Sequence, residues 1–178
     1  RLKTLKGKTI GDIQRDTTDQ IPNWSLTREY RVTYRDSLHH SEELTSGKML
    51  PEVKNPGDTI FVTISEGLKE SLELEIGDEV VFDVQGIPIT TFIGGVRKVD
   101  WPTDPPNFIF VFPKGVLEPA PKIFVITTRT TNSATAGVFL RELVTAFPNV
   151  SAIDLKLILE TLNTFFEKVA FAIRFMAL

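Results

Sequence analysis

The sequence predicts an α+β fold, and three features of the chain support this prediction. Short strands separated by tight turns are expected between residues 59 and 99. After them the expected order is strand, strand, helix, strand, helix, which is typical of helices packed on one face of a sheet. The chain then ends in one long helical pattern, from Ser151 to Leu178.

The composition is that of an ordinary globular domain. The chain has 178 residues, of which 42% are hydrophobic and 24% are charged, enough for one large domain or two small subdomains with a real core. The net charge of −3 argues against a nucleic-acid partner, because a basic excess is needed to meet phosphates. The absence of cysteine excludes disulfides, cysteine-ligated zinc and thiol catalysis.

The first 58 residues are expected to be mostly irregular. Residues 1–10 alternate loosely and predict a short strand, whereas residues 11–25 predict a polar loop. Residues 27–35 predict a strand, because Tyr30, Val32 and Tyr34 share one face and charged residues share the other. Residues 36–56 are polar and interrupted by glycine and proline, which predicts a second loop.

Residues 59–99 predict a small barrel or meander. The apolar run 59–64 predicts a buried strand, and Ser65 is expected to cap a short helix over residues 66–74. Strands are expected over 79–84 and 87–93, with turns at 77–78 and 85–86. The pair Gly94-Gly95 predicts a β-bulge before a last stretch at 96–99.

The next part of the chain predicts two strands and a helix. Beyond a proline-rich loop at 101–106, apolar strands are expected over 107–112 and 122–129. Residues 133–147 have the apolar spacing of an amphipathic helix, which Pro148 ends. Residues 150–153 predict a short strand before the terminal helix.

The terminal helical pattern leaves two interpretations open. Ser151 and Asp154 predict an N-terminal cap. Apolar residues then recur at helical spacing, at Leu155, Leu159, Leu162, Phe166, Val169, Ile173 and Met176, and no charge, glycine or proline follows Arg174. We expect this helix either to continue into a membrane span or to dock on the core of its own domain.

The chain itself is expected to be a soluble segment excised from a longer protein. It begins without an initiator methionine or a signal peptide. No stretch has the roughly 18 consecutive apolar residues that a membrane-spanning helix needs.

Residues that could carry chemistry have simpler structural explanations. His39 and His40, with Glu42 and Glu43, form the only cluster of candidate metal ligands, but adjacent side chains converge poorly, so we expect a solvated loop. No G-x-S-x-G motif and no glycine-rich phosphate loop is present. We therefore predict no catalytic, cofactor-binding or metal-ligating residues. Turns and an outward strand position account for the four aspartates Asp78, Asp83, Asp100 and Asp104.

Arg97, Asp100 and Trp101 are the candidate partner contacts. Arg97 lies between an apolar strand and the proline-rich loop. Trp101 is expected either to pack on the core of the small barrel or to be an exposed aromatic anchor for a partner.

Four segments, in their order and spacing, resemble the extracytoplasmic domain of large FtsX/MacB-type ABC transporter permeases. They are REYRVTYRD at 28–36, ISEGLKESLELEIGDEVVFDVQGIPITTFIGGVRKVDW at 64–101, PNFIFVFPKGVLE at 106–118 and AFPNVSAIDLKLILETLNTFFEKVAFAIR at 146–174. The resemblance extends from about Tyr30 to the end of the chain.

The resemblance implies a domain organisation in three parts. Residues 1–58 would be the first part of a porter-like sheet-and-helix subdomain, truncated at its N-terminus. Residues 59–106 would be a β-rich insertion, and residues 107–178 the second porter-like half. Its last part, 151–178, would be a stalk helix leading toward a transmembrane helix, with Phe171, Phe175 and Leu178 near the membrane and exposed.

The resemblance also implies a function. The domain would be non-catalytic and would lie on the extracytoplasmic (periplasmic) side of a bacterial inner membrane, anchored by flanking transmembrane helices. It would couple ATP-driven motion to the handling of a substrate or partner. The implied partners are a cognate ABC ATPase subunit, a second permease unit or protomer, and a lipid, lipoprotein or protein; no cofactor and no nucleic acid is implied. The alternative is a free-standing soluble α+β ligand-binding module or enzyme with a pocket near Trp101.

Overall fold

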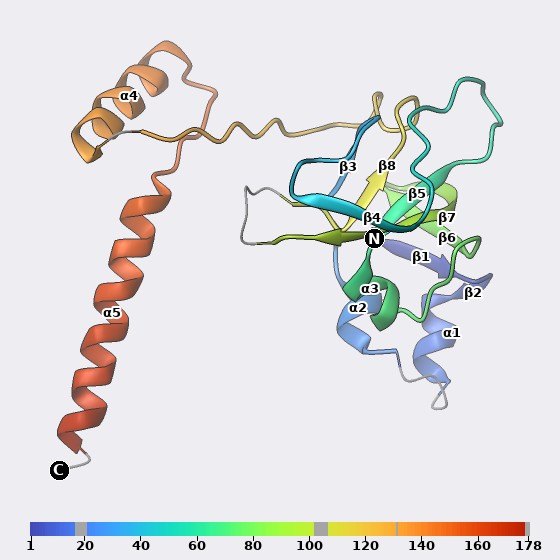
Figure 1. Ribbon diagram of the computed structural model, residues 1–178, viewed down its shortest axis with the longest axis horizontal. Coiled ribbons are helices and arrows are strands. Elements are labelled where there is room, and N and C mark those ends of the chain that lie inside the picture. Colours follow the sequence, from blue (N-terminus) through green and yellow to red (C-terminus); the bar gives the residue numbers. More distant parts are fainter. Residues whose placement is uncertain (17–20, 102–106, 131, 177–178) are drawn as a thin grey trace. The chain divides into compact units, whose positions relative to one another are not determined.

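A computed structural model describes residues 1–16, 21–101, 107–130 and 132–176 (Figure 1). It contains a mixed sheet and several helices, which confirms the predicted α+β class. The chain forms two compact units, Arg1–Val125 and Ile126–Leu178.

The first unit is built on one mixed sheet. Within the described residues the strand order is β2-β1-β6-β7-β5-β8-β3, and β4 pairs with β7 outside this path. β5 runs parallel to β7 and β3 runs parallel to β8, while the other pairs are antiparallel. The strands are β1 (Leu2–Leu5), β2 (Lys8–Thr9), β3 (Val32–Tyr34), β4 (Glu42–Gly47), β5 (Phe61–Ser65), β6 (Glu79–Val84), β7 (Ile87–Val99) and β8 (Phe110–Phe112).

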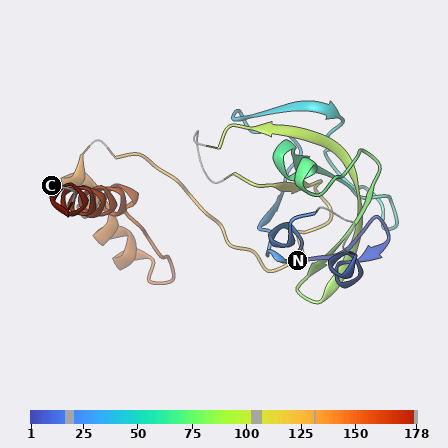
Figure 2. The same cartoon turned by 90° about the horizontal axis from the view of Figure 1, so that it is seen from below.

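β7 is the strand that joins most of this sheet, and it curves through the unit in Figure 2. It pairs with β6 from Ile87 to Phe92, with β5 along its centre, and with β4 from Gly95 to Val99. The register against β5 shifts between Ile93 and Gly95, which confirms the predicted bulge at Gly94. A Cβ atom on Gly94 would lie 2.8 Å from the Cβ of Phe61, so this close approach requires glycine.

Aromatic rings form the centre of the core. Phe82 stands edge-on to Phe110 and Phe112, with ring centroids 4.9 and 5.2 Å apart. Tyr30 also packs edge-on against Phe110, and its hydroxyl donates a hydrogen bond of 2.6 Å to the carbonyl of Ser25. Burial raises the pKa of the Tyr30 hydroxyl to about 12.

The described residues of the first unit form three short helices: α1 (Ile10–Arg15), α2 (Asn23–Thr27) and α3 (Glu66–Ser71). The hydroxyl of Thr9 accepts a hydrogen bond from the N–H of Asp12 and so caps α1. The prediction of a loop over 11–25 is therefore wrong where α1 and α2 form. α3 confirms the predicted helix, although Ser65 occupies the N-cap position without a capping side-chain bond.

Three further predictions of secondary structure are wrong. Residues 36–56 were expected to form a polar loop but contain β4. This strand forms because its backbone groups pair with those of β7. The expected strand over 122–129 does not form, since no strand pairs with these residues in the described part of the chain. Its side chains are exposed, with Ile123 and Ile126 both 91% exposed. The short strand expected at 150–153 is also absent.

The second unit contains α4 (Ser133–Ala146) and α5 (Leu155–Met176). Asn132 caps α4, since its side-chain oxygen accepts a hydrogen bond of 2.8 Å from the N–H of Thr135. The carboxylate of Asp154 accepts hydrogen bonds from the N–H groups of Lys156 and Leu157, at 2.9 and 3.3 Å. The cap of the terminal helix is thus Asp154 and not Ser151.

The described part of the second unit has almost no core of its own. Ala136 is its only buried hydrophobic residue among those described. The apolar positions of α5 from Leu155 to Ile173 are exposed by 39% to 63%. No helix in the described residues is both long and apolar enough to cross a membrane.

Sheet pairing connects the chain across positions 58 and 106, while the predicted three-part organisation stays a prediction. Residues 59–106 supply β5, β6 and β7, which pair directly with β8, β1 and β4 from the chain on either side. A shared sheet cannot be separated at these points without breaking its hydrogen bonds, so the first unit continues to Val125.

Candidate functional site

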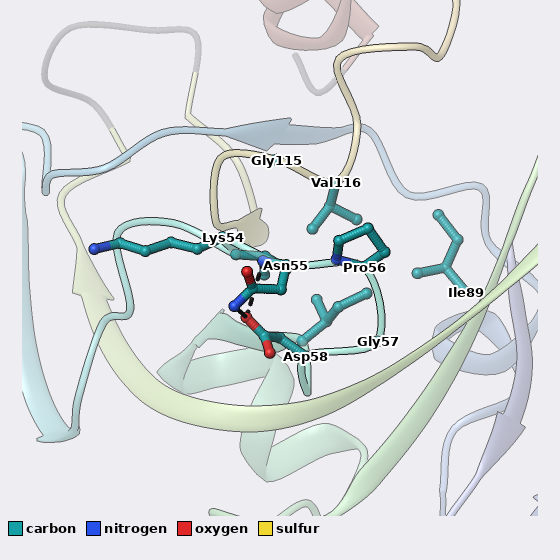
Figure 3. Close-up of a pocket in the computed structure, with 10 residues that line it drawn as sticks. Lys54, Asn55, Pro56, Gly57, Asp58, Ile89, Gly115 and Val116 are labelled. Atoms are coloured by element: carbon teal, nitrogen blue, oxygen red, sulfur yellow. Dashed lines mark hydrogen bonds between the residues drawn. The ribbon is translucent and has the colours of Figure 1, made fainter.

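A shallow hollow of about 540 Å³ lies beside the turn at residues 53–58 (Figure 3). Ile89 and Val116 point toward Pro56 across it, whereas Lys54 extends away from them. The carboxylate of Asp58 accepts hydrogen bonds from the backbone N–H and the side-chain amide of Asn55, at 3.0 and 3.1 Å. These polar groups are occupied within the turn, so the hollow offers mainly apolar surface and no convergent catalytic groups.

The largest concentration of buried charge lies elsewhere, at the ends of β3, β4 and β7. The guanidinium of Arg97 on β7 is ion-paired with the carboxylate of Glu42 on β4, with 0% and 1% of the two side chains exposed. Arg35, which follows β3, pairs with the same carboxylate and is 23% exposed. One carboxylate therefore joins two cations that come from different strands.

The remaining hydrogen bonds of Arg97 fix two more segments of the chain. Its Nε donates to the hydroxyl of Thr63 on β5 at 2.8 Å. Its Nη2 donates to the carbonyls of Phe108 and Ile109, both at 3.0 Å, just before β8. Arg97 thus ties together β4, β5, β7 and the segment leading into β8, which explains how a buried charge is tolerated.

Burial and ion pairing act in opposite directions on these groups. Burial lowers the pKa of Arg97, and the neighbouring charge of Glu42 opposes that change. For Glu42, burial favours the neutral acid, but the hydrogen bond from Arg35 and the charges of Arg97 and Arg35 together hold its pKa below the ordinary value. The carboxylate is therefore ionised at neutral pH, and this network is a fixed ionic contact rather than an acid–base pair.

Asp100 and Trp101 directly follow the C-terminal end of β7, the strand that carries Arg97. The N–H of Asp100 donates to the carbonyl of Ser41 at 2.9 Å. The side-chain amide of Asn107 donates to the carbonyls of Asp100 and Trp101, at 3.2 and 3.3 Å. Ser41 donates in turn to the side-chain oxygen of Asn107 at 3.3 Å. The N–H of Asp100 and the carbonyls of Asp100 and Trp101 are thus all hydrogen-bonded, while half of the tryptophan side chain is exposed.

A second shallow hollow lies next to Asp100. It is lined by His40, Ser41, Glu42, Glu43, Lys98, Val99 and Asp100, most of which are polar. The ring of His40 lies against the ring of His39, with centroids 4.1 Å apart. No group of three or more histidine, cysteine, aspartate or glutamate residues in the described chain is arranged to hold a metal ion.

The structure separates the three candidate partner contacts into a buried and an exposed set. Asp100 and Trp101 are exposed, and Asp100 lines the second hollow, whereas the side chain of Arg97 is buried inside the unit. The sequence carries a signal for this burial, because Arg97 is in phase with the buried residues Ile93 and Gly95 along an alternating strand. The sequence does not identify Glu42 as the partner of Arg97, because nothing local distinguishes it from the other glutamates of a polar segment.

The three membrane-proximal candidates lie at the end of α5. Phe171 and Phe175 belong to the helix, and their side chains lie outside the described residues. Leu178 lies wholly outside the described residues. The nearest apolar residues with described side chains, Val169 and Ile173, are 39% and 57% exposed.

Comparison with known proteins gives one informative similarity. The sequence is 29% identical over 136 residues to YbbP of Escherichia coli (strain K12), named an uncharacterized ABC transporter permease. This chain is similar to part of an ABC transporter permease. The alignment covers 76% of the chain but 16% of YbbP, so the chain corresponds to a small part of that protein. The similarity supports a permease-related domain with a transporter-associated role.

Two other comparisons add no relative. No family model matches the chain. No solved structure is significantly similar to it.

Proposed function

We propose that residues 1–178 form a non-catalytic, extracytoplasmic domain of an FtsX/MacB-type ABC transporter permease. The observation that carries the proposal is the similarity to a permease over 76% of the chain. The described helices include none that could cross a membrane. A permease segment of this kind is best accounted for as a domain that projects from the membrane on the stalk helix α5.

The apolar surface of α5 supports this role for the helix. Six of its apolar residues, from Leu155 to Ile173, recur in alternating steps of four and three, so they form one stripe along the helix. The stripe is not covered within its own unit, and charged residues such as Lys156, Glu160 and Glu167 lie on the other side. A helix that carries uncovered apolar surface from Leu155 to Ile173 is suited to pack against other permease helices or against a second permease unit.

In this proposal the domain transmits motion and does not catalyse a reaction. An ABC ATPase subunit would hydrolyse ATP on the other side of the membrane, and α5 would carry the resulting movement to the sheet of the first unit. The exposed side chains of Asp100 and Trp101 would contact the substrate or partner, which is a lipid, a lipoprotein or another protein.

The gene that encodes this chain provides the direct test of membrane attachment. The proposal predicts an apolar run of about 20 residues in the codons that follow Leu178, the length that spans a bilayer. A stop codon or a polar linker at that place would reject the stalk and favour a free-standing soluble module instead.

A further inference from the structure

We infer that Arg97 is a positioning residue: its buried guanidinium fixes the residues whose hydrogen bonds hold the backbone of Asp100 and Trp101, and so presents Trp101 at the surface. This inference rests on the proposed contact between Trp101 and a partner. Arg97 would therefore act through other residues, and not through the direct partner contact that the sequence suggested for it.

The first of these hydrogen bonds, from the N–H of Asp100, depends on Glu42. Arg97 binds the carboxylate of Glu42, and the residue before it, Ser41, accepts the hydrogen bond from the N–H of Asp100. Val99, which precedes Asp100, is paired with Glu42 in the register of β4 and β7. Moving Glu42 would therefore move the backbone acceptor that holds Asp100.

The hydrogen bonds to the carbonyls of Asp100 and Trp101 depend on the segment before β8. Arg97 donates to the carbonyls of Phe108 and Ile109, which directly follow Asn107. Asn107 is the residue whose amide binds the carbonyls of Asp100 and Trp101. The two sets of contacts are also linked to each other, because the hydroxyl of Ser41 donates to the side chain of Asn107.

The guanidinium group is suited to this arrangement because its five donors are held in one plane. Arg97 uses Nε toward Thr63, Nη1 toward Glu42 and Nη2 toward two carbonyls, so three separate segments are fixed by one rigid group. A lysine at this position has a single ammonium group and cannot reach all three. The positioning role is therefore specific to arginine and not to positive charge.

The fluorescence of Trp101 tests the inference. The chain contains two tryptophans, so a Trp24→Phe background leaves Trp101 as the only indole emitter. In this background, Arg97→Lys and the milder Thr63→Val are compared by acrylamide quenching, well below the unfolding temperature of each variant. Thr63→Val removes the acceptor of Nε with little change of volume, so it decides the question if Arg97→Lys does not fold.

Lys114→Met is the matched control. Lys114 forms an ion pair of 2.6 Å with Asp36, which lies in the loop before Glu42. Unlike the side chains of Arg97 and Glu42, both of these side chains are about half exposed. The substitution removes a cation from the same part of the unit without touching the segment around Trp101.

The inference predicts that Arg97→Lys and Thr63→Val raise the quenching constant, by up to about two-fold because Trp101 is already 50% exposed. Lys114→Met should leave the constant unchanged. Equal constants in all folded variants, or an equal rise in the Lys114→Met control, would overturn the positioning role. Neither result bears on membrane attachment, which the sequence beyond Leu178 decides separately.

Discussion

Arg97 and Glu42 form an ion pair that is closed off from solvent, with 0% and 1% of their side chains exposed. The pair joins β7 to β4, the strand that lies outside the continuous path of the sheet. Because Arg35 shares the same carboxylate, the network has two cations and one anion. The following predictions depend on this contact and on the two-unit organisation of the chain.

Removing the cation should destabilise the first unit strongly. Arg97→Met leaves the carboxylate of Glu42 buried with Arg35 as its remaining cation, and breaking a buried pair costs about 3–5 kcal/mol. Lys114→Met breaks a half-exposed pair and should cost far less, because exposed ion pairs contribute little to stability. Urea denaturation of both variants measures the difference in the free energy of unfolding. Similar values for the two would show that the buried pair adds no more than a surface contact.

The stability of the unit should depend on the charge of Glu42 at acid pH. Its pKa in the folded chain is held below the ordinary value, although burial acts against this, because Arg35 and Arg97 stabilise the carboxylate. Such a group stabilises the fold fully above the ordinary glutamate pKa, and the contribution is lost as the pH falls through the lower, folded pKa.

Glu42→Gln provides the test of this pH dependence. The variant should be less stable than the parent at neutral pH, and the difference should shrink as the pH falls below the ordinary pKa of glutamate. Free energies of unfolding at a series of pH values give the two curves. Parallel curves throughout the acid range would contradict the assignment of a lowered pKa to Glu42.

The end of β4 should tolerate only glycine at position 47. Gly47 has a φ of +74°, and a Cβ atom there would lie 2.3 Å from the carbonyl oxygen of Gly94. Gly57 has a φ of +98° but open space around it, so Gly57→Ala pays only the backbone strain of roughly 1–2 kcal/mol. Gly47→Ala should be clearly less stable than Gly57→Ala in thermal unfolding. Equal melting temperatures would mean that β4 shifts away from β7 without loss.

The first unit should fold without the second. Residues 1–125 contain the aromatic core and the whole described sheet, whereas the second unit has one buried hydrophobic residue among those described. A chain that ends at Val125 should unfold cooperatively, with the midpoint that tryptophan fluorescence gives for residues 1–178. A broad or lost transition would show that the first unit needs α4 or α5 for its stability.

The strands of the middle region could be predicted because their signals are local. The alternation in residues 79–84, the turn at Gln85-Gly86 and the bulge at Gly94 each depend on neighbouring residues, and all three are present in the structure. β4 could not be predicted in the same way. Its polar sequence, Glu42–Gly47, forms a strand only because the distant end of β7 pairs with it.

Tertiary context also explains why the strand predicted over residues 122–129 is absent. Residues 122–129 have strong strand propensity, but a strand needs a neighbour for its N–H and C=O groups, and none is paired with it in the described chain. The candidate site shows the same limit. The exposure of Trp101 fits one of the two sequence-based alternatives, whereas the Arg97–Glu42 contact joins residues 55 positions apart and had no local signal.

The placement of the domain outside the cytoplasm is the central claim, and labelling of single cysteines tests it most directly. The chain has no cysteine, so Lys48→Cys and Ser71→Cys place one thiol each on exposed or partly exposed positions of the first unit. The variants are made in the complete natural protein, and intact cells are treated with a membrane-impermeant maleimide. The account predicts labelling of both thiols in intact cells. Labelling only after the cells are lysed would contradict it.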